Sequence, residues 1–384
     1  MAAPMAAPMA AAATAASCIG PCRARLLHFS RNNTAGFVVP TSKALKKITA
    51  RFRELRAAIL LHARGVGDAR VQAAAQRPLC LDVGAAAYGH VDWADGSDSL
   101  LLLDQFGHID GAQIHAFEMQ PQHAERLARI VARTRKQLKS KSRAEVIVHS
   151  TGLSDAPSRD HSVVAQGGAS VHNTFSLGRR VAKASARVGL RVNVSTIDLW
   201  ADAQRLDRPL FYIKVDVEGG EPRVLAGMRR LLASPHAPLF MSFEYSWTWS
   251  QTIASLNARR RQRFRTRAPP PKSVGEPSLQ TFVANLTAHG YNAYLLHARG
   301  LVRISGPWWH PFYELAALPD PIDCWHDIFV ARPGVAQRAL TSLFNARPFP
   351  CQVDERKACR TTASASTPLD AVLGADCVRC ELAS

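Results

Sequence analysis

The chain has 384 residues and a formal net charge of +18, and this length permits one large or two ordinary domains with a substantial core. No run of 18 apolar residues occurs, so the sequence predicts no transmembrane helix, and eight cysteines are too few for a disulfide scaffold in a chain this long. Residues 1–53 and 256–275 contain no acid and carry 15 of the 18 excess positive charges, which disfavours a basic nucleic-acid groove formed by the folded part.

The first 64 residues form an Ala- and Arg-rich N-terminal segment. Its opening, "MAAPMAAPMAAAATAASCIGPCRARLLHFSR", is free of acids and rich in Ala, Ser and Arg, which is typical of a transit peptide to a plastid or mitochondrion. A secretory signal, or an Ala-rich tail on a cytoplasmic protein, is the alternative. Apolar residues at helical spacing predict a helix over 42–64. We interpret 1–64 as a targeting or accessory segment.

From residue 65 onward, predicted strands alternate with predicted helices. Alternation of this kind is typical of an α/β protein with a mostly parallel sheet covered on both sides. Five main strands and two late strands predict a doubly wound, seven-stranded sheet with a hairpin at one edge. The predicted main strands are 79–83, 112–118, 145–149, 210–217 and 239–245, with late strands in "NAYLLHA" and "HDIFVAR".

Two segments interrupt or follow this pattern. Residues 258–276 are Arg-rich and contain three consecutive prolines, which predicts a basic surface loop inserted into the domain. Residues 336–384 form a tail that contains four cysteines, of which Cys377 and Cys380 alone have the CxxC spacing. A zinc site usually needs two such close pairs, so we expect free thiols or a disulfide there instead.

Carboxylates follow the carboxyl end of each main strand. In a doubly wound sheet the ligand binds beyond these ends, where the strand order reverses. Glu118 has the position of an acid that binds the two ribose hydroxyls of a nucleotide. The turn "GAAAYG" after the first strand lacks the central glycine of a dinucleotide phosphate loop, so the cationic S-adenosylmethionine fits an acidic edge better than NAD. The acids at the strand ends are Asp82, Glu118, Asp155, Asp216, Glu218 and Glu244.

Several of these segments carry a resemblance to a known family. "LCLDVGA", "IHAFEMQPQHAERL", "GLSD", "VSTIDLW", "YIKVDVEGGEPRVLAGMRRLL" and "FEY" resemble the ordered motifs of FkbM-type S-adenosylmethionine-dependent methyltransferases. The likeness spans about residues 78–332, and "KVDVEGGE" preceded by "TIDLW" is its most specific part. It implies a methyltransferase domain over 65–335 with the class I, Rossmann-like fold. It also implies O-methylation of a hydroxyl on a small molecule or glycan.

The resemblance assigns roles to individual residues. It places the cofactor against Asp82, Gly84, Glu118, Ser154 and Asp155. Asp216, Glu218, Gly219 and Glu221 match the family's "DVEG.E" signature, and we take the three carboxylates among them as the catalytic candidates.

A hydroxyl acceptor must lose its proton, and one of the three signature carboxylates is the candidate base. Alternatively, Asp216 and Glu244 hold Mg²⁺, which lowers the pKa of the acceptor. Glu221 has a further interpretation as a cap on the following helix.

Other functions remain open at this point. One is a catalytically inactive methyltransferase-like protein whose basic loop, 258–276, binds an anionic partner. Another is an RNA-directed methyltransferase, although Phe264 is the only aromatic residue in the Arg-rich run that a base could stack on. A nicotinamide oxidoreductase is disfavoured because the phosphate turn is missing. Acceptor pockets are built from variable loops, so the sequence does not identify the methyl acceptor.

Overall fold

The computed structural model describes nine stretches of the chain, and several predicted features lie outside them. Outside are the targeting sequence proper, Glu218, the basic loop 258–276 and the four cysteines of the tail; delivery to an organelle therefore stays a prediction. The described residues are 48–85, 98–137, 143–163, 190–217, 219–246, 278–297, 300–306, 309 and 325–344.

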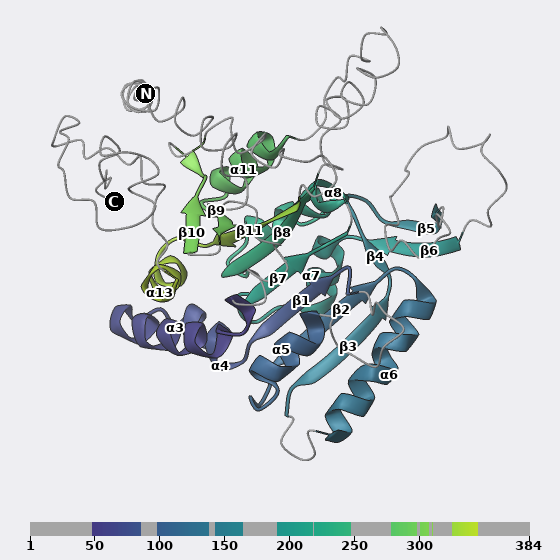
Figure 1. Ribbon diagram of the computed structural model, residues 1–384, viewed down its shortest axis with the longest axis horizontal. Coiled ribbons are helices and arrows are strands. Elements are labelled where there is room, and N and C mark those ends of the chain that lie inside the picture. Colours follow the sequence, from purple (N-terminus) through teal and green to yellow (C-terminus); the bar gives the residue numbers. More distant parts are fainter. Residues whose placement is uncertain are drawn as a thin grey trace, which may run out of the picture.

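The main sheet has eight strands in the order β10-β9-β11-β8-β7-β1-β2-β3 (Figure 1). Strands β8, β7, β1, β2 and β3 are parallel to their neighbours in this block, and β11, β9 and β10 pair antiparallel. The predicted mixed α/β fold with a mostly parallel, Rossmann-like sheet is thus confirmed. The bounds are β1 (Leu79–Val83), β2 (Gln113–Glu118), β3 (Glu145–Ser150), β7 (Tyr212–Val215), β8 (Phe240–Ser246), β9 (Asn292–His297), β10 (Gly300–Arg303) and β11 (Trp325–Ala331).

The late strands differ in arrangement from the prediction. We expected the two late strands to pair with each other at the edge, and β9 and β11 do pair. However, β11 lies inside the sheet, between β8 and β9, and the edge hairpin is formed by β9 with β10, a strand that the sequence did not indicate. A second, small sheet has the order β4-β6-β5. Its bounds are β4 (Gly152–Leu153), β5 (Ser158–Val163) and β6 (Leu190–Ser195).

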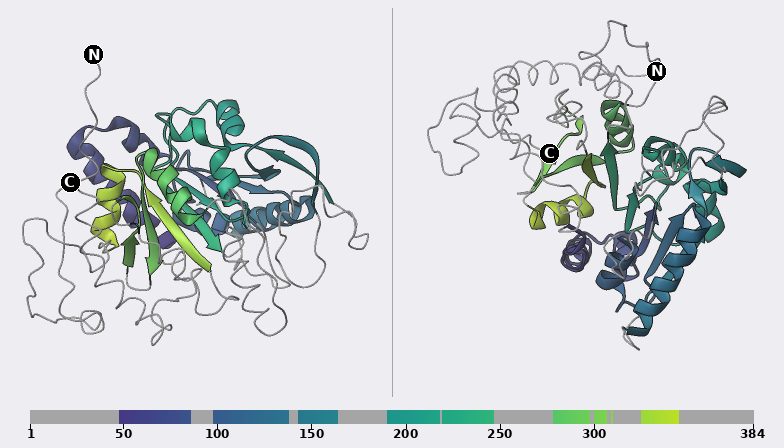
Figure 2. Two further views of the ribbon diagram at one scale, coloured as in Figure 1. Left: turned by 90° about the horizontal axis from the view of Figure 1, so that it is seen from above. Right: turned by 45° about the vertical axis from the view of Figure 1, so that its right-hand side comes forward.

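Helices cover both faces of the main sheet (Figure 2). Side chains alternate between the faces of a strand, so Cys80 and Tyr212 join one apolar cluster, whereas Leu81 and Ile213 join the other. Burial on both faces explains why β1 and β7 are almost continuously apolar. The first cluster includes α3 (Phe52–Val66), α4 (Ala69–Gln76), α5 (Asp98–Phe106), α6 (Pro121–Gln137) and α13 (Val335–Leu343). The second includes α7 (Ile197–Gln204), α8 (Glu221–Ala226), α9 (Arg229–Leu232) and α11 (Leu279–Ala288).

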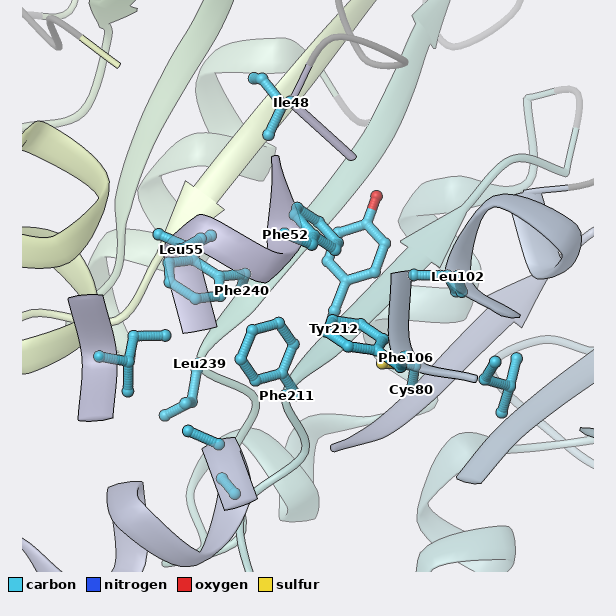
Figure 3. Packing of buried hydrophobic residues seen from close by; sticks show 14 of the residues in the cluster. Ile48, Phe52, Leu55, Cys80, Leu102, Phe106, Phe211, Tyr212, Leu239 and Phe240 are labelled. Atoms are coloured by element: carbon cyan, nitrogen blue, oxygen red, sulfur yellow. The ribbon is translucent and has the colours of Figure 1, made fainter. Parts of the chain in front are cut away.

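Helix α3 belongs to the core of the domain. It runs from Phe52 to Val66, whereas the sequence predicted a helix over 42–64, and it ends at Gly67 in the left-handed conformation, with φ 70°. The Phe52 ring is fully buried, 4.8 Å from the Tyr212 ring and 6.0 Å from the Phe211 ring (Figure 3). Residues 52–64 therefore pack with the sheet, as an accessory segment would.

Helix α13 extends the packed unit beyond residue 335. It lies in the segment that we interpreted as a C-terminal tail, yet its inner face is buried in the same cluster as α3. The Arg51 guanidinium stacks 4.9 Å from the centre of the Phe344 ring and donates a hydrogen bond of 2.9 Å to the carbonyl of Leu343. Both ends of the folded unit thus lie against each other. Within the described part of the chain, no helix has the length and apolar character needed to cross a membrane.

We predict that Phe52→Ala lowers the free energy of unfolding by about 3–5 kcal/mol, because it leaves a cavity among aromatic rings. Leu61→Ala, on the same helix but 72% exposed, is the matched control and should change it by less than about 0.5 kcal/mol. Urea unfolding followed by circular dichroism measures both. Equal stabilities of the two variants would contradict the assignment of α3 to the core.

Candidate functional site

The strand order reverses between β1 and β7. From β1 the sheet continues through β2 to β3 on one side, and through β7 to β8 on the other. In open α/β sheets this point marks the ligand site, beyond the carboxyl ends of the strands. The hydrogen bonding between β1 and β7 continues one residue past the end of β7, because the Asp216 amide donates to the carbonyl of Val83 at 2.9 Å. Asp82, Gly84 and Asp216 are therefore brought together as the sequence predicted.

Gly84 is required by the closeness of these two strand ends. Its φ is +86°, and a Cβ atom built on it would lie 1.7 Å from the carbonyl oxygen of Asp216. No side chain fits in that space, so only glycine lets the chain turn here while β1 and β7 stay paired. The family resemblance predicted that this glycine lies against the cofactor. The structure shows that it lets the backbone approach Asp216.

A buried lysine, Lys214, joins the carboxylates around β7. Its Nζ lies 2.7 Å from an oxygen of Asp98 at the start of α5 and 2.9 Å from an oxygen of Asp216, and its side chain is only 9% exposed. Burial alone lowers the pKa of Lys214, but the charges of Asp216, Asp98 and Asp82 outweigh it and raise the pKa well above the usual value. Lys214 is therefore a cation held by acids.

Sequence analysis did not identify Lys214 or Asp98. A signal was present, because a lysine in the middle of the apolar strand "YIKV" must be paired if both faces of that strand are buried. Its partner could not be read from the sequence, since Asp98 comes from another element.

Asp82 is anchored by the start of α5. One of its oxygens, Oδ2, accepts hydrogen bonds from the Ser99 amide at 2.7 Å and the Ser99 hydroxyl at 2.6 Å. Its other oxygen, Oδ1, is buried and has no hydrogen-bond partner among the described residues. Burial raises the pKa of Asp82 to about 6, although the charge of Lys214 opposes this. Asp82 thus orients α5 and keeps one oxygen for a further donor.

Glu118 ends β2, beside β1. It is 4% exposed, and its Oε1 accepts a hydrogen bond of 2.8 Å from the Gln120 amide. Burial raises its pKa to about 7, and the charge of Asp82 contributes in the same direction. A pair of hydroxyl donors, such as those of a ribose, would stabilise the charged form of this carboxylate.

Three carboxylates converge where β7, α8 and β8 meet. Asp216, Glu221 and Glu244 each offer an oxygen, and these oxygens all lie within 4.8 Å of one another. The predicted pair of Asp216 and Glu244 is therefore brought together, and Glu221 joins it. Sequence analysis placed Glu221 among the base candidates but not among the metal ligands.

Glu221 closes the loop between β7 and α8. It is fully buried, and its Oε1 accepts hydrogen bonds from the amides of Val217 at 2.8 Å and Gly219 at 3.2 Å. These donors precede α8, and the amide of Glu221 itself, the first of the helix, also contributes. Glu221 therefore holds the loop that leads into the helix, and its carboxylate also lies at the helix N-terminus, where we had considered a cap. Burial raises the pKa of Glu221 to about 8.

Asp327 is a further acid that sequence analysis missed. It lies on β11 directly opposite Glu244 on β8 and is 7% exposed. Burial, together with the charge of Asp216, raises its pKa to about 8. The sequence motif "HDIFVAR" did not indicate this position, because the placement of β11 beside β8 depends on long-range pairing.

Ser154 and Asp155 follow β4 of the small sheet. The Ser154 hydroxyl donates to the Asp155 carboxylate at 2.9 Å, and that carboxylate lies 3.9 Å from Nε of Arg223 on α8. A Cβ atom at Gly227 would lie 2.0 Å from the Ser154 carbonyl oxygen. The turn predicted to contact the cofactor thus packs against the C-terminal end of α8, whereas Glu221 begins that helix.

Comparison with models of known protein families identifies the family to which this region belongs. The model of the methyltransferase FkbM domain matches residues 82–274, which is half of the chain. The chain belongs to the FkbM methyltransferase family. The match begins at Asp82 and includes Glu118, Asp216 and Glu244, so the acids at the strand ends all lie within the family's own domain.

Comparisons with individual proteins add little to this assignment. No curated protein matches the chain. Among solved structures, the chain is similar to a DUF574 family protein from Streptomyces avermitilis, with 11% identity, a TM-score of 0.28, and coverage of 74% of this chain and 83% of that one. A similarity this low supports no argument about function.

We predict that Gly84→Ala lowers the free energy of unfolding by at least about 3 kcal/mol, since the backbone of β1 or of Asp216 must move. Gly67→Ala is the control, because Gly67 has a similar φ of +70° but no atom within 4 Å of the added Cβ. The free energy of unfolding of Gly67→Ala should therefore fall by only about 1 kcal/mol. Chemical unfolding of both variants separates the clash from the backbone strain. Similar losses in the two would contradict the close approach at Gly84.

Proposed function

We propose that this protein transfers a methyl group from S-adenosylmethionine to a hydroxyl of a small molecule or glycan. The observation that carries the proposal is the set of carboxylates at the reversal of strand order: Asp82 and Glu118, which are buried at the ends of β1 and β2, and the half-buried Asp216 after β7. Membership of the FkbM family supports methyl transfer in general.

The residues at this edge fit the cofactor. Glu118 would bind the ribose hydroxyls through the oxygen that the Gln120 amide leaves available. Oδ1 of Asp82, buried and without a partner in the described stretches, would accept from a donor on the methionine end. When bound, the cofactor supplies a methyl group on a positively charged sulfur, and an edge rich in carboxylates favours that charge.

Asp216 is the best-placed base among the described acids. Lys214 holds one of its oxygens at 2.9 Å and, against the effect of burial, lowers the pKa of Asp216 below its usual value. The carboxylate is thus charged and able to accept a proton from a hydroxyl. Its side chain is 33% exposed, so an acceptor can reach it from solvent. Alignment of the acceptor oxygen with the methyl group would supply much of the rate.

A cation held by Asp216 and Glu244 is the alternative to a base at this position. Mg²⁺ there would lower the pKa of the acceptor hydroxyl, so that its proton would pass to a solvent water instead of to a side chain. Both versions place the acceptor beside Asp216.

We predict that Glu118→Gln weakens S-adenosylmethionine binding about 10- to 100-fold, the cost of losing a charged hydrogen-bond acceptor. Glu145→Gln, an exposed acid on β3, is the control and should bind normally. Isothermal titration calorimetry measures both, and normal binding by Glu118→Gln would contradict the ribose assignment.

The same assignment predicts a pH dependence. Because the pKa of Glu118 is raised to about 7, the carboxyl is mostly protonated below pH 7 and charged above it. A ligand that donates to the charged form should therefore bind about tenfold more weakly for each unit below pH 7. In Glu118→Gln this dependence should be absent. A wild-type affinity that stays constant between pH 5.5 and 7.5 would count against the ribose contact.

We predict that Asp216→Asn binds S-adenosylmethionine normally but transfers methyl groups at least about 100-fold more slowly, as for loss of a base or metal ligand. Asp207→Asn, an exposed acid ahead of β7, is the control. The assay follows label from methyl-labelled S-adenosylmethionine into a panel of polyols and sugars. Full activity in Asp216→Asn would remove Asp216 from the reaction.

A further inference from the structure

The geometry of Asp216, Glu221 and Glu244 matches that of ligands around one ion. Their oxygens lie within 4.8 Å of one another. Two oxygens bound to the same divalent cation, at bond lengths of about 2.0–2.4 Å, are at most about 4–5 Å apart. The three oxygens are therefore near enough for adjustments of the side chains alone to bring them around a single ion.

An unpartnered oxygen of Glu221 points to a missing ligand. Glu221 is 0% exposed, and its Oε2 has no hydrogen-bond partner among the described residues. Its Oε1 is held by the amides of Val217 and Gly219, so the carboxylate is fixed in orientation. Burying a carboxylate oxygen without a partner is costly, and a bound cation would remove that cost.

The crowding of carboxylates around Asp216 also favours a bound cation. An oxygen of Glu244 lies within 4.8 Å of one oxygen of Asp216 and one of Glu221. Lys214 does not relieve this crowding alone, because it also pairs with Asp98 at 2.7 Å. Asp327 brings a further buried carboxyl group directly opposite Glu244. A divalent cation would offset the negative charge that these carboxylates bring together.

We propose that Asp216, Glu221 and Glu244 bind one divalent cation of the class that prefers oxygen ligands, Mg²⁺ or Mn²⁺. Three carboxylate ligands leave about three of the six positions of such an ion open. An acceptor with two adjacent hydroxyls fills two of them, which narrows the substrate to vicinal diols such as sugars and other polyols. This use of the ion rests on the proposed function, whereas binding of the ion does not.

The test is direct titration of the full-length, chelator-treated protein with Mn²⁺, followed by electron paramagnetic resonance, with Mg²⁺ as competitor. The wild-type protein should bind one Mn²⁺ per chain. Asp216→Asn, Glu221→Gln and Glu244→Gln should each weaken binding at least about tenfold, and Asp207→Asn should not. Glu221→Gln retains an Oε1 that can accept from Val217 and Gly219, so the loop stays intact, and circular dichroism checks the fold of each variant.

Absence of Mn²⁺ binding by the folded wild-type protein, or wild-type binding in all three variants, would overturn the cation site. Calorimetry with S-adenosylmethionine alone separates this result from the proposed function. Cofactor binding without Mn²⁺ binding overturns the cation site and leaves the proposed function standing. Mn²⁺ binding without cofactor binding supports the cation site and overturns the proposed function.

Discussion

The buried ion pairs of Lys214 are the constraint on which the rest of the site depends. Lys214 stands in the middle strand of the sheet and joins Asp98 at the start of α5 to Asp216 at the end of β7. Removing one partner of such a buried pair typically costs about 3–5 kcal/mol, because the other charge is left uncompensated. The network therefore fixes the position of α5 and Asp216 together. Asp82, which accepts from Ser99 on the same helix, is fixed with them.

The carboxyl edge of the sheet holds more acid than this lysine can neutralise. Burial raises the pKa of Asp82 to about 6, of Glu118 to about 7 and of Glu221 to about 8. For each of these groups the charged form is disfavoured in the fold, so the ligand-free protein loses stability as pH rises from the usual carboxyl range toward these values. A bound cationic cofactor or metal ion would stabilise the charged carboxylates and so offset this loss of stability. Acids kept at such a cost are typical of a binding site rather than of a structural feature.

The face of β7 that carries Lys214, together with the strands beside it, supplies the rigid support. The Phe52 ring of α3 packs edge-to-face with Tyr212, two residues before Lys214, and the Tyr212 hydroxyl contacts Ser242 on β8 at 2.6 Å. Helix α13 covers α3 in turn. A closely packed aromatic cluster transmits little movement, so the side chains at the ends of β7 and β8 keep their mutual geometry. Positioning to within a fraction of an ångström is what methyl transfer requires.

The sequence by itself determined the type of fold, the family and the acids at the strand ends. These features depend on local information: β-branched runs form strands, and the residue after a buried strand lies at the edge of the sheet. Asp82, Glu118, Asp216 and Glu244 were predictable for that reason. The tertiary structure decided which of these acids meet. In the folded protein Glu221 is buried, and β11 pairs with β8 so that Asp327 lies opposite Glu244. Lys214 pairs with Asp98, which lies 116 positions earlier in the chain. Contacts of this kind depend on which distant segments pack together, and no local pattern of residues records that choice.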